Sequence, residues 1–142
     1  MDNYRSSCSA LIKQINDSLE KSANNTLRAE DLTMSQIAVL LALDQAGEKT
    51  LSMKMLQEQF GVAQPTMFGT VRRLERKELV TCFSNPQDGR SKLVQLTEAG
   101  KKKCDAGYVH MDEAEAQLLQ ALDAAEREQF RGLLEKIRRS LQ

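Results

Sequence analysis

Cationic and polar side chains gather on one side of a predicted helix that begins at Pro65. At 100° per residue, the apolar Met67, Val71 and Leu74 share one face of this helix. Proline is favourable at the first helical position, where its missing N–H would be unbonded anyway. The opposite face carries Pro65, Gly69, Arg72, Arg73 and Arg76, flanked by Thr66 and Phe68. The outer face is therefore small and neutral at its start and cationic further along.

This distribution suits a helix that enters the major groove of DNA by its N-terminal end. Gln64 and Thr66 can hydrogen-bond base edges, Gly69 permits a close approach, and Phe68 can press on a thymine methyl group. The three arginines can bind phosphates or guanines. Taken alone, they fit an ordinary solvated basic helix equally well.

The residues before Pro65 favour the DNA-binding interpretation. A short helix is predicted over residues 53–60, with Met55, Leu56 and Phe60 facing inward. Gly61 permits a sharp turn, and Val62 is expected to fill the corner before the next helix. This spacing is typical of a helix–turn–helix motif.

A second group of candidate residues lies at the tip of a predicted hairpin. Residues 79–84 and 91–96 are predicted strands, and the turn-forming residues 85–90 join them. An arginine at such a tip, here Arg90, can enter an A·T-rich minor groove, with the Asp88 carboxylate orienting its guanidinium. In isolation the tip fits a solvent-exposed hairpin with a casual ion pair. Beside a helix–turn–helix, it is predicted to be a DNA-binding wing.

The elements that must position both groups are mainly helical. A first helix is predicted over residues 5–24, ending near Asn24 and Asn25, and a buried second helix from a capping box at Thr33 to Gly47. A long helix follows from Thr97 to about residue 120, and a terminal helix begins at a capping box at Asp123. The predicted fold class is mainly α, a winged helix-turn-helix with a two-stranded wing and terminal dimerisation helices. Residues 1–32 are the predicted N-terminal dimerisation helix, residues 33–97 the DNA-binding lobe, and residues 98–142 the C-terminal dimerisation helices.

Composition narrows the function further. The net charge is zero, but residues 50–103 carry ten basic and five acidic side chains, and both flanking segments are acidic. A basic middle between acidic ends suggests a module that faces phosphates. No apolar run could span a bilayer and no signal peptide is recognisable, so we expect a cytoplasmic protein without a membrane partner.

Catalytic and metal-binding chemistry is not expected. Cys8, Cys82 and Cys104 are odd in number and widely spaced, which argues against a disulfide framework and against a zinc site. His110 is the only histidine and is expected at a surface or interface. With no metal cluster, Ser/His/Asp triad or glycine-rich phosphate loop, we predict no enzyme, no metal and no cofactor.

The terminal helices carry apolar stripes that this short chain has too little other structure to cover. One stripe includes Leu11, Ile12 and Ile15, and another includes Leu133, Leu134 and Ile137. We therefore expect a second copy of the chain to cover them.

Four stretches together resemble the MarR (multiple antibiotic resistance regulator) family of winged-helix regulators. They are residues 32–40, 60–66, 71–80 and the segment from Asn85 to Gly100 that contains the hairpin tip. The resemblance implies an obligate homodimer that binds a pseudo-palindromic operator in double-stranded DNA, and a ligand or oxidant that changes the spacing of the two lobes. Together with the residue chemistry, it gives these predicted DNA-binding residues: Gln64, Thr66, Phe68, Gly69, Thr70, Arg72, Arg73, Arg76, Asp88, Arg90 and Lys92.

This sequence departs from the family pattern at four positions. Glu78 replaces a glycine, so the helix exit is expected to use a turn that an L-residue can adopt. Cys82 and Gly89 stand where arginine is usual, and Phe68 stands where a small hydroxyl residue is common. The last three reduce the polarity of the predicted DNA face.

The sequence therefore predicts a homodimeric, sequence-specific transcriptional repressor that a small ligand releases from DNA. Two alternatives remain. One is a dimeric winged-helix module for protein interaction, with weak or no DNA binding. The other is a thiol-based redox sensor that uses Cys8 in the first helix, although packing explains that cysteine more simply.

Overall fold

The computed structural model describes residues 4–142, which form two compact units divided between His110 and Met111. The first unit holds the helix–turn–helix, the sheet, and helices that pack on them. The second holds the end of one long helix and the C-terminal helix. The predicted mainly helical winged fold is confirmed. No helix within residues 4–142 is long and apolar enough to cross a membrane.

Helix α1 runs over Cys8–Ala29, after a short 3-10 helix at Tyr4–Ser6. Ser7 caps it by accepting a hydrogen bond from the Ala10 N–H. The prediction that this helix stops near Asn24 was wrong. Its last turn is held by tertiary contacts, because Leu27 is buried in the core and the Thr26 hydroxyl bonds His110 Nδ1 at 3.1 Å.

Helix α2 covers Met34–Gln45 and begins at the predicted capping box. Thr33 Oγ1 accepts from the Gln36 N–H, and Gln36 Oε1 accepts from the Thr33 N–H. Val39, Leu40 and Leu43 are almost completely buried at the centre of the core. The prediction of a buried helix is confirmed.

The Asp44 carboxylate near the end of α2 joins three segments of the first unit. Its side chain is only 7% exposed, and it accepts from Lys49 Nζ at 2.8 Å and from the Tyr108 hydroxyl at 2.9 Å. Lys101 Nζ lies 3.2 Å away and completes the cluster. These partners, with the bond to Lys49 foremost, hold the pKa of Asp44 at about 2 against the opposing effect of burial.

The sheet has three antiparallel strands in the order β1-β3-β2, namely Thr50–Ser52, Lys92–Leu96 and Val80–Ser84. Leu51 and Cys82 pair with Val94 from opposite sides. The sequence predicted only the two strands of the wing. The third has only three residues, too few for alternation of apolar and polar side chains to reveal it.

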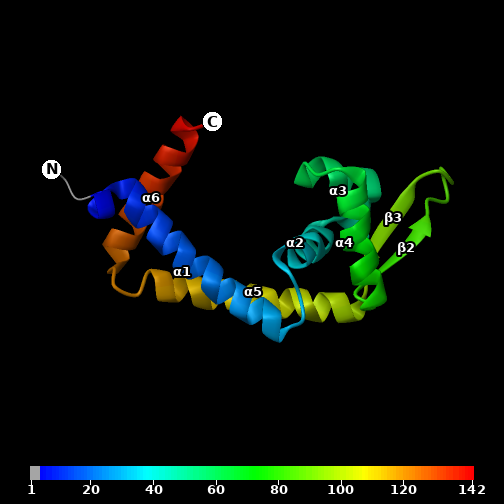
Figure 1. The fold of residues 1–142 in the computed structure, drawn as a ribbon, viewed down its shortest axis with the longest axis horizontal. Coiled ribbons are helices and arrows are strands. Elements are labelled where there is room, and N and C mark those ends of the chain that lie inside the picture. The colour runs from blue at the N-terminus through cyan, green and yellow to red at the C-terminus, as the bar shows by residue number, and fades with distance from the viewer. Residues whose placement is uncertain (1–3) are drawn as a thin grey trace. The chain divides into compact units, whose positions relative to one another are not determined.

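Helices α3 (Met53–Phe60) and α4 (Gln64–Arg76) form the helix–turn–helix (Figure 1). Gly61 ends α3 in the left-handed conformation, with φ of 61°, as the turn requires. Leu56 is fully buried, but Met55 is 52% exposed, so the prediction that Met55 faces inward was wrong. Val62 is also partly exposed, at 37%, and fills the corner less completely than predicted.

The junction between α4 and β2 contains a strained residue. Glu78 has φ of 63°, in the left-handed region that disfavours L-residues, so the expected relaxed turn was wrong. The Glu78 carbonyl accepts a hydrogen bond from the Thr97 hydroxyl at 2.8 Å. That hydroxyl also accepts from the Gly100 N–H at 3.0 Å and thereby caps helix α5 (Glu98–Leu118).

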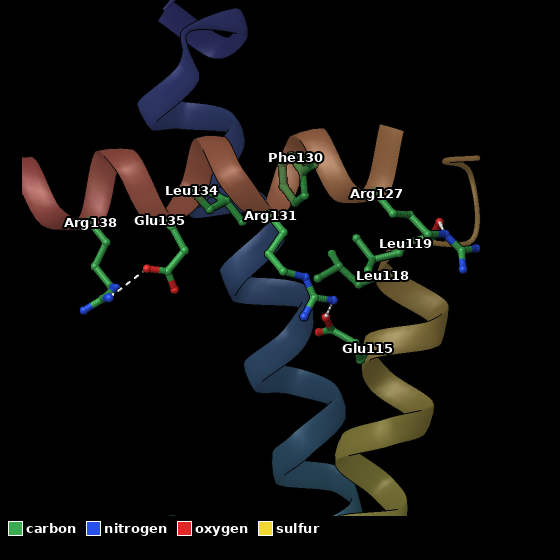
Figure 2. Close-up of a pocket in the computed structure, with 9 residues that line it drawn as sticks. All are labelled: Glu115, Leu118, Leu119, Arg127, Phe130, Arg131, Leu134, Glu135 and Arg138. Atoms are coloured by element: carbon green, nitrogen blue, oxygen red, sulfur yellow. Dashed lines mark hydrogen bonds and ion pairs between the residues drawn. The ribbon is translucent and has the colours of Figure 1, made fainter. Parts of the chain in front are cut away.

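The second unit contains the end of α5 and helix α6 (Ala124–Ser140). The predicted capping box at Asp123 is confirmed, with Glu126 as its partner. A hollow of about 280 Å³ lies between the two helical segments, and the side chains that line it are drawn in Figure 2. Arg127 Nε donates to the Leu119 and Leu122 carbonyls there, which fixes the turn between the helices.

Candidate nucleic-acid interface

The exposed face of α4 is polar and cationic, as the sequence predicts. Gln64, Thr66, Phe68, Arg72, Arg73 and Arg76 are exposed, whereas Met67, Val71 and Leu74 are buried in the core. Ala63 is the N-cap residue and offers no side-chain acceptor, so the first backbone N–H groups of the helix lack a side-chain cap. Pro65 has no N–H, and the Thr66 N–H donates to the Ala63 carbonyl at 3.1 Å, so the Gln64 N–H is the group that the start of α4 can offer to an external acceptor such as a phosphate.

Two of the arginines fold back along α4 towards its N-terminal end. The Arg72 guanidinium carbon lies 5.7 Å from the centroid of the Phe68 ring, within range of a cation–π interaction. Arg73 Nη1 lies 3.4 Å from the position that a Cβ atom would take on Gly69. The end of the Arg73 side chain thus packs beside Gly69.

Thr70 differs from the other predicted DNA-binding residues. It is 8% exposed, and its hydroxyl donates to the Thr66 carbonyl one turn earlier at 3.2 Å. The resemblance to the MarR family placed it at the interface. The geometry gives it an internal role, and we leave it out of the interface.

The wing tip is shaped by the Asp88 carboxylate. Asp88 Oδ1 accepts from the Arg90 backbone N–H at 3.1 Å, and Oδ2 accepts from the Ser91 hydroxyl at 3.0 Å. The expected ion pair with the Arg90 guanidinium is absent from the structure of residues 4–142. Asp88 thus orders the backbone of the tip and leaves the exposed Arg90 side chain available for a ligand.

A groove of about 290 Å³ connects the wing to the helix–turn–helix. Gln64 and Phe68 of α4 line it, together with Arg90 and Lys92 of the wing. Lys54, at the start of α3, is a further cation on its wall that the sequence did not single out. It lies ten residues before α4, and only the tertiary structure brings it to this surface. None of the nine lining residues is acidic, so the groove suits a polyanion.

The three cysteines lie in different environments. Cys104 is fully buried, and burial raises its pKa to about 11. Burial and the neighbouring Glu75 carboxylate raise the pKa of Cys82 to about 11 as well. Both side chains are therefore protonated thiols near neutral pH, which disfavours reaction with oxidants. Cys8, at the start of α1, is exposed. Within residues 4–142, no group of His, Cys, Asp and Glu side chains is placed to hold a metal ion.

Comparison with known proteins agrees with this geometry. Residues 32–92 match the model of the MarR family. The HTH-type transcriptional regulator YxaD of Bacillus subtilis is 32% identical over 113 residues, which cover 80% of this chain and 78% of that protein. The HTH-type transcriptional repressor NicR of Pseudomonas putida is 34% identical over 106 residues, which cover 75% of this chain and 66% of that protein.

Solved structures give the same result. A single-residue mutant of MepR from S. aureus superimposes with a TM-score of 0.86 at 30% identity, over 96% of this chain and 99% of MepR. The complex of MepR with DNA has a TM-score of 0.77 at 29% identity, over 94% of this chain and 98% of that one. The relatives named here are regulators of transcription, which agrees with the prediction that this chain is not an enzyme. On its sequence, its fold and its relatives, the chain belongs to the MarR family of winged-helix transcriptional regulators.

Proposed function

We propose that this regulator is a cytoplasmic homodimer that represses transcription by binding a pseudo-palindromic operator, and that a small ligand releases it. The observation that carries the proposal is the groove between α4 and the wing, whose lining includes the cations Lys54, Arg90 and Lys92 and no acidic residue. The exposed arginines of α4 lie on the helix that forms one side of it. Residues 33–97 act as the DNA-binding lobe, and residues 1–32 and 98–142 act as dimerisation helices. The name of the related repressor NicR supports repression rather than activation.

In this proposal α4 lies in the major groove and the wing reaches the adjacent minor groove. Gln64 and Thr66 face base edges, because they occupy the first turn of α4. Arg72 lies in the third turn and reaches towards the same end of the helix because its side chain folds back over Phe68. Arg73, Arg76 and Lys92 bind phosphates and supply affinity without sequence information. Arg90 enters the minor groove, where the negative potential is strongest in A·T-rich DNA.

Dimerisation is supported by apolar side chains that the chain leaves exposed. Leu11, Ile12 and Ile15 of α1 are each more than 40% exposed. In the second unit, Leu133, Leu134 and Ile137 of α6 are exposed to a similar degree. Helices with such stripes are stable in water when another subunit covers them. Sedimentation at micromolar concentration should give the mass of a dimer, and a monomeric mass would contradict the proposal.

DNA binding is tested by titrating the protein against the intergenic DNA upstream of its own gene at two salt concentrations. We expect a saturable complex whose affinity falls steeply with salt, because several phosphates are neutralised. A weak response that is the same for unrelated DNA would instead favour the alternative, a winged-helix module for protein interaction.

A polar hollow in the first unit is our candidate for the ligand site. It has a volume of about 370 Å³ and is lined mainly by residues at the end of α1 and the start of α2, including Asn24, Arg28 and Thr33. Lys77 and the carboxylate of Asp31 also line it, and they form an ion pair at 3.7 Å, while the Lys77 ammonium group further contacts the Asp31 carbonyl and Gln36 Oε1. With Arg28 as the available cation, the hollow suits a small organic acid.

Release requires that the ligand bind the DNA-incompetent state more tightly than the competent one. The DNA titration should therefore be repeated with a panel of small organic acids, using wild-type protein and Arg28→Ala. An acid that releases wild-type protein should lose its effect on the variant. Equal release of both proteins would place the ligand elsewhere.

Redox sensing is a second candidate, and the exposure of Cys8 is the observation that favours it. The buried Cys104 and the protonated Cys82 leave Cys8 as the thiol most open to oxidation. If Cys8 is a sensor, mild peroxide should abolish DNA binding by the wild-type protein but not by Cys8→Ser. Equal loss in both proteins, or Cys8 remaining reduced while binding is lost, would exclude it.

A further inference from the structure

We propose that Phe68 is a positioning residue that holds the Arg72 guanidinium for contact with a guanine base, and that this pair sets part of the sequence selectivity of α4. The proposal rests on the proposed DNA-binding function and deepens it. It replaces the direct contact between Phe68 and thymine that the sequence suggested.

The first observation is the placement of the two side chains. Phe68 and Arg72 lie one turn apart on the exposed face of α4, and the Arg72 guanidinium carbon lies 5.7 Å from the centre of the ring. The ring is 44% exposed and stands outside the buried core cluster. The ring therefore does not belong to the core, and it contacts the Arg72 cation.

The second observation is that the ring is the partner that holds Arg72. Within residues 4–142, no carboxylate forms an ion pair with this guanidinium. Arg73 packs instead against Gly69, where a ring is lacking. Arg72 is thus distinguished from its neighbours by an aromatic support that restrains a long and otherwise mobile side chain.

The direction of Arg72 decides what it can reach. Because it folds back over the residue four positions earlier, its guanidinium lies towards Gln64 and the end of α4 that enters the major groove. A cation–π contact uses the charge of the group and leaves its N–H donors for other acceptors. Guanine offers O6 and N7 side by side, which suits a bidentate arginine fork.

A base contact and a phosphate contact differ in what they require. A phosphate accepts donors from many directions, so affinity for it depends mainly on charge. A bidentate contact with guanine needs a fixed orientation, which is what restraint by the ring provides. Loss of the ring should therefore reduce discrimination between bases more than it reduces the dependence on salt.

The test uses a DNA duplex that the wild-type protein selects from a randomised library. Dissociation constants are measured for that duplex, and for versions in which each G·C pair is replaced by A·T, at several salt concentrations. The variants are Phe68→Leu, which keeps apolar bulk, Phe68→Tyr, which keeps the ring, Arg72→Ala, and the double variant Phe68→Leu with Arg72→Ala. Arg76→Ala is the control for the loss of one exposed charge from the same helix.

We expect Phe68→Leu to weaken binding to the selected duplex about 3- to 10-fold and to lower discrimination at the same G·C pair that Arg72→Ala affects. The slope of log K against log salt should remain unchanged. Phe68→Tyr should bind like the wild type, and the double variant should bind like Arg72→Ala alone. Arg76→Ala should reduce the salt slope without changing discrimination.

Three results would overturn the proposal. Additive losses in the double variant would mean that Phe68 contacts DNA independently of Arg72. A salt slope that falls in Arg72→Ala as it does in Arg76→Ala would make Arg72 a phosphate contact. A Phe68→Tyr variant as weak as Phe68→Leu would exclude a role for the ring. If the wild-type protein enriches no sequence at all, the proposed sequence-specific function fails, whatever the variants do.

Discussion

Asp44 shows how one buried charge can hold several segments of the lobe together. Its carboxylate accepts hydrogen bonds from Lys49 and Tyr108 and pairs with Lys101, and thereby links the end of α2 to the residues before β1 and to α5. The three partners surround a carboxylate that is nearly inaccessible to water. Its ionised form is therefore stabilised by the native structure.

We predict that Asp44→Asn lowers the free energy of unfolding by about 1–3 kcal/mol at neutral pH, because hydrogen bonds to a charged acceptor are lost. The pKa of Asp44 is about 2 in the folded protein and near 4 in the unfolded chain. A depressed pKa contributes stability that is complete above the unfolded value and is lost as pH falls through the folded one. The difference between the two proteins should therefore be constant above about pH 5 and shrink between pH 4 and 2. Urea unfolding of both proteins at a fixed concentration measures this difference in the free energy of unfolding. A difference that does not change with pH would contradict a stabilising role for the ionised Asp44 carboxylate.

Gly100 is required by a close approach between α5 and the turn that leads from α4 into β2. A Cβ atom there would lie 2.2 Å from the Leu79 carbonyl oxygen. That oxygen also accepts a hydrogen bond from the Thr97 N–H, so it cannot move freely. We predict that Gly100→Ala destabilises the protein by about 3 kcal/mol, since backbone must shift.

Gly107 on the same helix is the matched control for this substitution. A Cβ atom there would meet only the end of the Ile37 side chain, at 3.4 Å. Gly107→Ala should change the stability by less than about 1 kcal/mol, because a small steric cost opposes the higher helix propensity of alanine. Thermal unfolding compares the two variants, and similar midpoints would contradict the account of Gly100.

At the scale of elements, the turn from α4 into β2 is destabilised by the backbone conformation of Glu78. Glu78 holds a positive φ that a glycine would adopt without steric cost. We predict that Glu78→Gly raises the free energy of unfolding by up to about 1 kcal/mol, as relief of strain outweighs the added entropy of the unfolded chain. Glu75→Gly, inside α4, should lower it instead. Chemical denaturation compares both with the wild type, and a loss of stability in Glu78→Gly would show that the strain is offset by contacts of the glutamate.

The wing tip offers a prediction in which two effects oppose one another. Removing the negative charge of Asp88 should favour DNA, but it also removes the two hydrogen bonds that shape the tip. We predict that loss of the ordered wing-tip backbone outweighs removal of the negative charge. Asp88→Ala should therefore weaken DNA binding by roughly fivefold, the free-energy equivalent of about one hydrogen bond. Glu58→Ala on α3 removes an exposed acid without changing the tip and should not weaken binding. Stronger binding by Asp88→Ala would show that its charge dominates.

Most elements of the fold could be predicted from local patterns. The capping boxes at Thr33 and Asp123 and the turn at Gly61 depend on neighbouring residues, and the structure confirms them. The end of α1 and the strand β1 depend on contacts with distant residues, which explains why the sequence misplaced the first and missed the second.

The same distinction applies to the candidate site. The exposed face of α4 follows from helical periodicity, and its polar and cationic side chains are exposed as predicted. Thr70, which the family resemblance added, turns inward to bond its own helix. Lys54 was missed because only tertiary structure brings α3 beside the wing. The stacking of Arg72 on Phe68 also needed coordinates, since a spacing of four residues permits such a contact but does not specify rotamers.

At the scale of the whole molecule, charge and exposed apolar surface lie on different parts of the chain. Cationic residues lie on the helix–turn–helix and wing, whereas α6 combines an exposed apolar stripe with mixed charges. A homodimer would place two cationic lobes on one DNA duplex, so that contacts are repeated at two half-sites.

The central claim is that α4 and the wing tip form the DNA-binding surface. It is tested most directly with two double variants. The first combines Arg73→Ala and Arg90→Ala, and the second combines Lys136→Ala and Arg139→Ala in α6. Both variants remove two exposed cations from each chain, so their net charges are equal. We predict that the first variant loses most of its affinity for the selected duplex and shows a shallower salt slope, while the second binds like the wild type. Equal losses in the two variants would mean that binding follows net charge alone, and would contradict the claim.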